Sequence, residues 1–107
     1  DVPPPAPTAA AQAEADAAAG EARSLADDGA ATLQRFLPLH DSGSWSYYGM
    51  LTPGRPWRSY LADLNYHCYH ITLLSRLDLL YPGMGFGDVA TRWQGDVDDS
   101  GQTCPER

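Results

Sequence analysis

The sequence predicts a mainly α-helical protein with one short β-hairpin, and three observations support this fold class. Apolar residues recur with helical spacing in three stretches, residues 9–37, 66–80 and 86–93. Tryptophan and tyrosine cluster at residues 45–48, a composition that favours strands. Proline or glycine separates the stretches from one another. A chain of 107 residues has room for one small domain with a modest core.

The first helix is expected after a proline-rich start. Residues 1–8 have the composition of an extended linker or a cut end, because successive prolines fix φ and remove donors. Thr8 can cap a helix over residues 9–19, which is rich in alanine but has little apolar surface to bury. Gly20 weakens the helix by about 1 kcal/mol relative to alanine. Residues 21–37 have a better apolar face, and the proline that follows ends the helix.

The hairpin and the second helix are expected in the middle of the chain. Strands at residues 45–51 and 57–64 would be joined by a tight loop that contains Pro-Gly. A helix then begins near Asn65, which can serve as its N-cap. Larger apolar residues follow at helical spacing, and we expect them to form the buried stripe of this helix. They are Tyr66, Tyr69, Leu73, Leu77 and Leu80.

A third helix and a polar tail complete the chain. Four residues at positions i, i+3, i+4 and i+7 predict the buried face of this helix: Phe86, Val89, Ala90 and Trp93. Residues 96–107 are acidic and polar, and we expect them to be a disordered tail. Cys68 falls in a helix and Cys104 in this tail, so the two cysteines do not indicate a disulfide framework. A bridge between them is possible, but we do not expect one.

The formal net charge of −7 lies at the two ends of the chain. Residues 1–31 carry −5 and residues 94–107 carry −3, whereas residues 32–93 carry +1. The net charge therefore does not exclude binding of a polyanion to the middle of the chain. The three histidines also lie there, and their protonation would add positive charge. The sequence has no lysine-rich or arginine-rich run, so nothing favours nucleic acid as a partner. No apolar run approaches the ~20 residues of a membrane-spanning helix.

Four blocks in the middle of the chain carry a family resemblance. Residues 32–44 read T-L-x-x-F-L-P-L-H-D-S-G-S, and Tyr48 follows them. Residues 65–71 read N-Y-H-x-x-H-I, and residues 86–93 read F-x-x-x-x-x-R-W. Together the blocks resemble the carboxyl-terminal part of D-glucuronyl C5-epimerases, over roughly residues 30–95.

The resemblance implies a fold and an activity. Residues 9–95 would be the terminal portion of an (α/α) toroid, and the amino-terminal β domain of the same enzyme would be a missing partner. The implied reaction converts D-glucuronate to L-iduronate units in a glucuronic-acid-containing polysaccharide. It implies no redox or nucleotide cofactor. We expect this chain alone to be inactive, because an upstream catalytic tyrosine segment is also missing. Exposed toroid faces would favour association, including with a second copy.

The reaction requires acid and base groups on both faces of the sugar and a cation near its carboxylate. The resemblance implies that Tyr48 and Tyr66 exchange the C5 proton, and we expect them to face each other across a sugar-sized gap. An unperturbed phenol has a pKa of about 10, so a tyrosine base needs surroundings that favour its anion, such as a helix amino terminus. Four residues near the tyrosines are candidates for substrate binding. They are Arg55, Arg58, His67 and His70.

Two positions depart from the family pattern. Asn65 stands where animal members have an aspartate, and Leu51 stands where they have an arginine. The second change removes a candidate clamp for the substrate carboxylate, and Arg55 or Arg58 would have to replace it.

Two further hypotheses about the function of these residues remain open. His67 and His70 are three residues apart with Cys68 between them, but no third metal ligand follows at suitable spacing, so we expect no metal site. A different class of function is a non-catalytic helical module that binds carbohydrate or docks a partner through an aromatic groove. The groove would be formed by Trp45, Tyr47, Tyr48 and Trp57.

Overall fold

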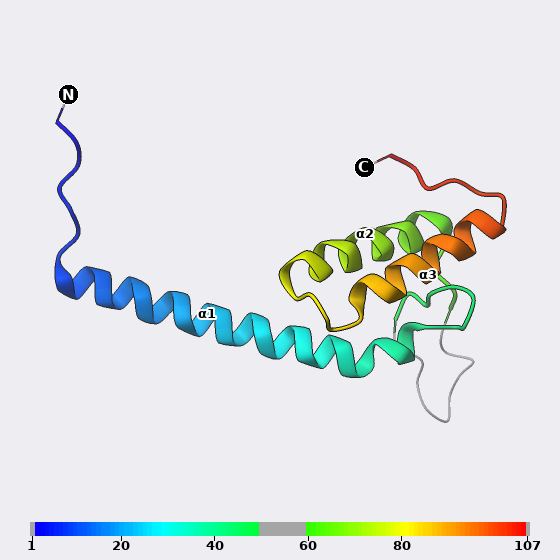
Figure 1. Ribbon diagram of the computed structural model, residues 1–107, viewed down its shortest axis with the longest axis horizontal. Helices are drawn as coiled ribbons and strands as arrows, with labels where there is room; N and C mark the ends of the chain where they lie inside the picture. Colours follow the sequence, from blue (N-terminus) through cyan, green and yellow to red (C-terminus); the bar gives the residue numbers. More distant parts are fainter. Residues whose placement is uncertain (1, 50–59, 107) are drawn as a thin grey trace. The chain divides into compact units, whose positions relative to one another are not determined.

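The computed structural model describes residues 2–49 and 60–106 (Figure 1). Its helices are α1 (Ala9–Phe36), the 3-10 helix η1 (Leu37–His40), α2 (Leu64–Leu80) and α3 (Phe86–Asp99). The predicted mainly α-helical class is therefore confirmed, and within the described ranges the backbone forms no strand. The chain divides into two compact units, residues 1–31 and residues 32–107.

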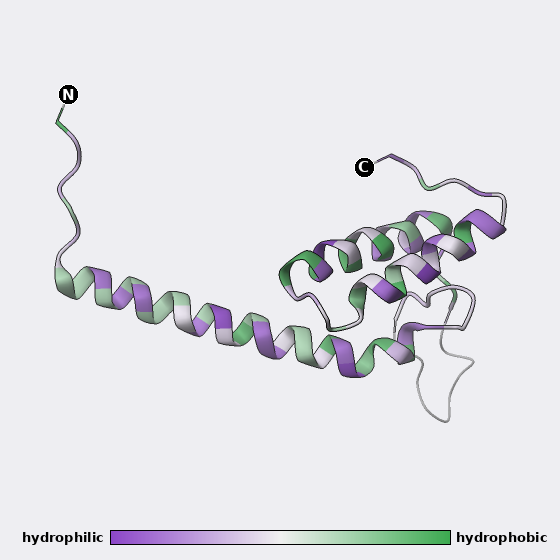
Figure 2. Ribbon diagram, in the orientation of Figure 1, coloured by the Kyte–Doolittle hydropathy of each residue, from purple (hydrophilic) through white to green (hydrophobic). Residues whose placement is uncertain are grey.

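The first unit consists of an extended start and most of α1. The backbone N–H of Ala11 donates to the Thr8 hydroxyl at 3.1 Å, so Thr8 caps the helix as its sequence position predicts. The helix passes through Gly20 without a break. Residues 9–29 are all exposed, and Figure 2 shows weakly hydrophobic and hydrophilic residues interspersed along α1. This part of α1 therefore depends on the helix propensity of its alanines. In the parts of the chain that the structure covers, no helix has the length and apolarity for a membrane crossing.

The core of the second unit lies between α2 and α3, which run side by side (Figure 1). From α3, Phe86, Ala90 and Trp93 are buried, which confirms three of the four residues of the predicted face, whereas Val89 is only half-buried. Val97 extends that face by one turn and is fully buried. Burial of such apolar side chains supplies about 1.5–3 kcal/mol each, so this contact is the main source of stability in the unit.

The predicted buried stripe of α2 is wrong. The buried residues of α2 are His67, Cys68, Ile71 and Leu74. Tyr66 and Tyr69, by contrast, are 53 % and 42 % exposed. Residue size alone favours the tyrosine and leucine stripe, but α3 packs against the neighbouring face of the helix. His67 can lie in that interface because hydrogen bonds satisfy its ring nitrogens.

The start of α2 also differs from the prediction. Asp63 is the N-cap instead of Asn65, and its carboxylate accepts a hydrogen bond from the backbone N–H of Tyr66 at 2.9 Å. An aspartate satisfies the free amide at this position and carries a negative charge that the helix amino terminus favours.

The carboxyl-terminal segment is more ordered than the sequence predicts. Helix α3 continues to Asp99, where a disordered tail was expected from residue 96, because the burial of Val97 outweighs the poor helix formers around it. Gly101, with φ of 76°, follows the helix end in the conformation that favours glycine. Cys104 forms a disulfide with Cys68, so the expectation that the two cysteines do not pair is wrong.

Antiparallel pairing occurs where the hairpin is expected, although it amounts to isolated bridges. Tyr47 bridges Leu61, the N–H of Tyr48 donates to the carbonyl of Tyr60 at 3.0 Å, and that of Ala62 donates to the carbonyl of Ser46 at 2.8 Å. Residues 50–59, which would form the tip, lie outside the described residues.

Candidate functional site

Tyr48 and Tyr66 lie next to each other on the surface of the second unit. Their ring centroids are 4.8 Å apart, with an angle of 71° between the planes. Tyr48 is 44 % exposed and Tyr66 is 53 % exposed, so both can meet a ligand. The expectation of a sugar-sized gap between the two phenols is wrong for this structure, because the rings are in direct edge contact.

Asp63 connects the two tyrosines. Its carboxylate accepts the N–H of Tyr66, while its own backbone N–H donates to the Tyr48 hydroxyl oxygen at 3.1 Å. The Tyr48 oxygen therefore lies at the amino terminus of α2, where backbone N–H groups and the helix dipole favour negative charge.

Ser46 lies between two histidines behind the tyrosines. Its hydroxyl is 2.7 Å from Nδ1 of His67 and 2.9 Å from Nδ1 of His70. Ser46 and His67 are fully buried. Trp45 stacks on the His67 ring with centroids 3.8 Å apart, and Nε2 of His67 is 3.3 Å from the carbonyl oxygen of Trp93. His67 consequently has no surface through which to contact a substrate.

His70 is only partly buried, and its ring lies 6.5 Å from that of Tyr66. Burial lowers the pKa of both His67 and His70 below the usual value, and the neighbouring His40 lowers that of His70 further. Burial likewise lowers the pKa of His40. The histidines are therefore neutral near pH 7, as hydrogen-bond acceptors or bases should be.

A cavity of about 280 Å³ opens beside this cluster. His40, Tyr48 and His70 contribute polar groups to its lining, and Trp93 and several leucines form the rest. The leucines are Leu33, Leu37, Leu73, Leu74 and Leu77. The cavity is near the small end of the range for ligand sites, and only a few of its lining residues are polar.

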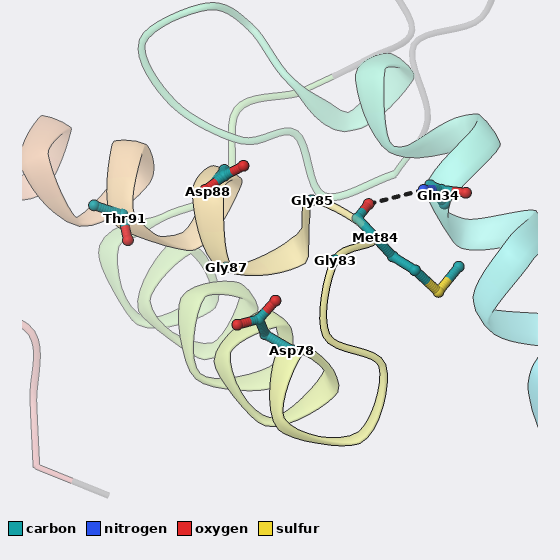
Figure 3. Close-up of a pocket in the computed structure, with 8 residues that line it drawn as sticks. All are labelled: Gln34, Asp78, Gly83, Met84, Gly85, Gly87, Asp88 and Thr91. Atoms are coloured by element: carbon teal, nitrogen blue, oxygen red, sulfur yellow. Dashed lines mark hydrogen bonds between the residues drawn. The ribbon is translucent and has the colours of Figure 1, made fainter.

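A second hollow, of about 600 Å³, lies at the other end of the α2 and α3 pair (Figure 3). Asp78 and Asp88 line it, and Gln34 donates to the carbonyl of Met84 at its edge, at 2.9 Å. Two carboxylates at this hollow disfavour an anionic sugar polymer, so the tyrosine cluster is the better candidate for a uronate.

Asp41 fixes the loop that carries Ser46. It forms an ion pair with Arg92, and it accepts hydrogen bonds from the N–H of Gly43 at 2.9 Å and from the Trp93 indole at 3.3 Å. Partial burial alone would raise the pKa of the Asp41 carboxyl, but these donors hold it below its usual value. Asp41 thus ties the loop to α3.

The structure brings together four of the predicted site residues, Tyr48, Tyr66, His67 and His70. Arg55, Arg58 and Trp57 lie outside the described residues. Sequence reasoning missed Ser46. One signal in the sequence could have found it, because Ser46 is a small polar residue within an aromatic segment whose side chains are expected to alternate between two faces. A hydroxyl on the buried face needs hydrogen-bond partners.

The fold and the site describe a helical module with two exposed phenols and a neutral histidine, groups suited to acid–base chemistry or to sugar binding. The family model described as D-glucuronyl C5-epimerase C-terminus matches residues 9–95. The chain belongs to this family, which confirms the resemblance found in the sequence. Comparisons with curated proteins and with solved structures found no match.

Proposed function

We propose that the chain is the carboxyl-terminal part of a uronate C5-epimerase that converts D-glucuronate to L-iduronate units in a polysaccharide. The observation that carries the proposal is the pairing of Tyr48 and Tyr66, two exposed phenols whose rings are 4.8 Å apart, in a chain of this family. They are the two groups that would remove and return the C5 proton. The family description supports a glucuronyl unit as the substrate.

In the proposed reaction, one tyrosine, as the phenolate, removes the C5 proton, and the electron pair moves into the carboxylate to give an enediolate. The other tyrosine, as the phenol, donates a proton to C5 from the opposite face, so one proton is lost and one gained. The N–H of Asp63 donates to the Tyr48 oxygen, and it would stabilise negative charge there. Arg55 or Arg58 would bind the substrate carboxylate.

The edge contact between the two rings has a consequence for this mechanism. A sugar that exchanges its proton on both faces must lie between the two phenols, so the rings must separate when substrate binds. Edge contacts between aromatic rings contribute about 0.5–1.5 kcal/mol, an energy that substrate binding can offset.

The proposal also covers the rest of the enzyme. We propose that the helices are the last part of an (α/α) toroid, that residues 45–64 complete a β-hairpin, and that an amino-terminal β domain and further helices close the cleft. Residues 1–107 alone would then be inactive. Association with a second copy through the exposed faces is part of the same proposal.

Deuterium exchange tests the activity. Glucuronan is incubated in heavy water with the full-length protein that contains this chain, or with residues 1–107 alone, and deuterium at C5 is measured. We expect exchange with the former only, and a 10²–10⁴-fold loss of conversion to iduronate in Tyr66→Phe, the usual contribution of an acid–base group. Tyr60→Phe is the matched control, because Tyr60 is 72 % exposed and no acid–base role is proposed for it. Undiminished conversion to iduronate in Tyr66→Phe would remove Tyr66 as an acid–base residue.

A non-catalytic carbohydrate-binding module is the second candidate, and the closed contact between Tyr48 and Tyr66 favours it. Aromatic surfaces bind sugars without chemistry, and this function needs no gap between the rings. Calorimetric binding of a glucuronan oligosaccharide, together with no exchange at C5 by the full-length protein, would favour this candidate.

A further inference from the structure

The hydrogen bonds around Ser46 have a fixed direction. The carbonyl oxygen of Trp93 can only accept, so the Nε2 atom of His67, 3.3 Å away, must carry a hydrogen. In the neutral imidazole, Nδ1 of His67 is then an acceptor, and the group 2.7 Å from it is the Ser46 hydroxyl. The single hydrogen of that hydroxyl is therefore donated to His67.

The position of the ring hydrogen of His70 is fixed in the same way. The Ser46 oxygen has already given its hydrogen to His67, so it can only accept from Nδ1 of His70 at 2.9 Å. His70 must then carry its hydrogen on Nδ1, which leaves Nε2 with a free lone pair in the neutral ring. Full burial of Ser46 and His67 excludes water as an alternative donor at the centre of this chain of hydrogen bonds.

We propose that Ser46 and His67 are positioning residues that hold His70 in its Nδ1–H tautomer and make Nε2 an acceptor for a hydroxyl group at the cavity beside Tyr48. His70 lines that cavity together with Tyr48 and His40. If the proposed function holds, on which this part of the inference rests, the ligand group is a sugar hydroxyl. A sugar hydroxyl can both donate and accept a hydrogen bond. An imidazole nitrogen without a hydrogen can only accept, so the hydroxyl would be the donor in this contact.

Charge around the cluster is consistent with two neutral rings. The Trp93 carbonyl, Asp96 and Asp41 favour a proton on His67, whereas a proton on His40 or His67 would disfavour one on His70. Desolvation outweighs the two carboxylates, and the pKa of each ring is lowered. The tautomers therefore describe the state near neutral pH.

Nitrogen-15 NMR of the chain tests the inference without substrate or activity. In long-range proton–nitrogen spectra near neutral pH, the hydrogen of an imidazole is assigned to Nδ1 or Nε2 from the shifts of both nitrogens. Resonances are assigned with His40→Gln and His70→Gln. We expect the hydrogen of His67 on Nε2 and that of His70 on Nδ1. A wild-type His70 with its hydrogen on Nε2 would overturn the inference.

Two serine variants separate positioning from general structure. Ser46→Ala should release His70 from the Nδ1–H tautomer, whereas Ser46→Thr should keep it, because threonine retains the hydroxyl. Ser75→Ala is the matched control, since Ser75 lies on the same helix as His70 and its hydroxyl donates to the carbonyl of Ile71. An unchanged His70 in Ser46→Ala would contradict the proposal. Should that variant fail to fold, the wild-type and Ser46→Thr spectra decide. Because no sugar is present, failure here is distinct from failure of the epimerase proposal.

Discussion

The two units of the chain show how differently a helix can be stabilised. Residues 9–29 form a regular helix in which every side chain is exposed, and alanine propensity and the Thr8 cap maintain it. Residues 32–106 have less favourable local propensity, but they bury Phe86, Trp93 and Val97 completely or nearly so. Helix propensity is therefore sufficient to maintain a helix, whereas a site needs a core to position its side chains.

The candidate site belongs entirely to the second unit. Trp93 contributes to the core, and its carbonyl and indole also bond His67 and Asp41, so packing and the polar cluster share one residue. All residues named above for this cluster lie within residues 32–107. The two units should therefore respond independently to mutation, pH and reduction.

Removing the Trp93 side chain should give the largest effect. Trp93→Ala leaves a cavity in the core and should cost the second unit about 3–5 kcal/mol of unfolding free energy. Urea unfolding followed by near-ultraviolet circular dichroism measures this loss. The far-ultraviolet helix signal of residues 9–31 should survive, and a simultaneous loss of both signals would contradict the independence of the units.

The disulfide should have the next largest effect. Cys68 and Cys104 close a loop with a sequence separation of 36, and a crosslink of this kind contributes about 2–4 kcal/mol. Cys104→Ser should lower the unfolding free energy of the second unit by that amount. Reductant should destabilise the wild type and leave Cys104→Ser unaffected. Equal sensitivity of both proteins to reductant would show that the crosslink contributes no stability.

Acidification should weaken the second unit in two steps. The folded pKa values of His40, His67 and His70 are lowered, so below about pH 6.5 the unfolded chain binds protons that the folded chain does not, and stability falls. The folded pKa of Asp41 is also lowered. Its contribution is present above the unfolded value of about 3.9 and is lost as pH falls through the lower folded value.

Unfolding free energies measured across a pH series test both steps. His70→Gln should flatten the upper step, because glutamine does not titrate. A constant free energy between pH 7 and 5 would contradict neutral histidines in the folded state.

Gly20→Ala should give the smallest effect, and only in the first unit. A Cβ at Gly20 meets no atom within 4 Å, so alanine should strengthen α1 by about 0.5–1 kcal/mol. The helical circular dichroism signal should rise, and the urea midpoint of the second unit should not change. A shifted midpoint would show that the units are coupled.

Local sequence patterns predicted helix α3 and the cap at Thr8 because each depends on residues within a few positions of one another. The buried face of α2 was predicted wrongly because Tyr66, Tyr69 and Leu73 are the larger apolar residues, while the choice of face depends on α3, about 25 residues away. His67 enters the core only because Ser46 and Trp93 satisfy it. Pairing of Cys68 with Cys104 likewise depends on how the helices pack.

The candidate site was likewise predicted only in part from the sequence. The sequence identified Tyr48, Tyr66 and the two histidines through the family resemblance. It could not identify Ser46, whose role exists only once both histidines lie within hydrogen-bonding distance of it. It also could not predict the contact between the tyrosine rings, which depends on the angle at which the 45–49 segment meets α2.

The most direct test of the central claim is the release of deuterium from C5 of both epimers. Polysaccharides labelled at C5 of either glucuronate or iduronate units are given to the full-length protein, to Tyr48→Phe and to Tyr66→Phe. If the two tyrosines act on opposite faces, both variants should lose epimerisation, and each should lose release from a different epimer. Wild-type rates of release from both epimers in both variants would contradict the account.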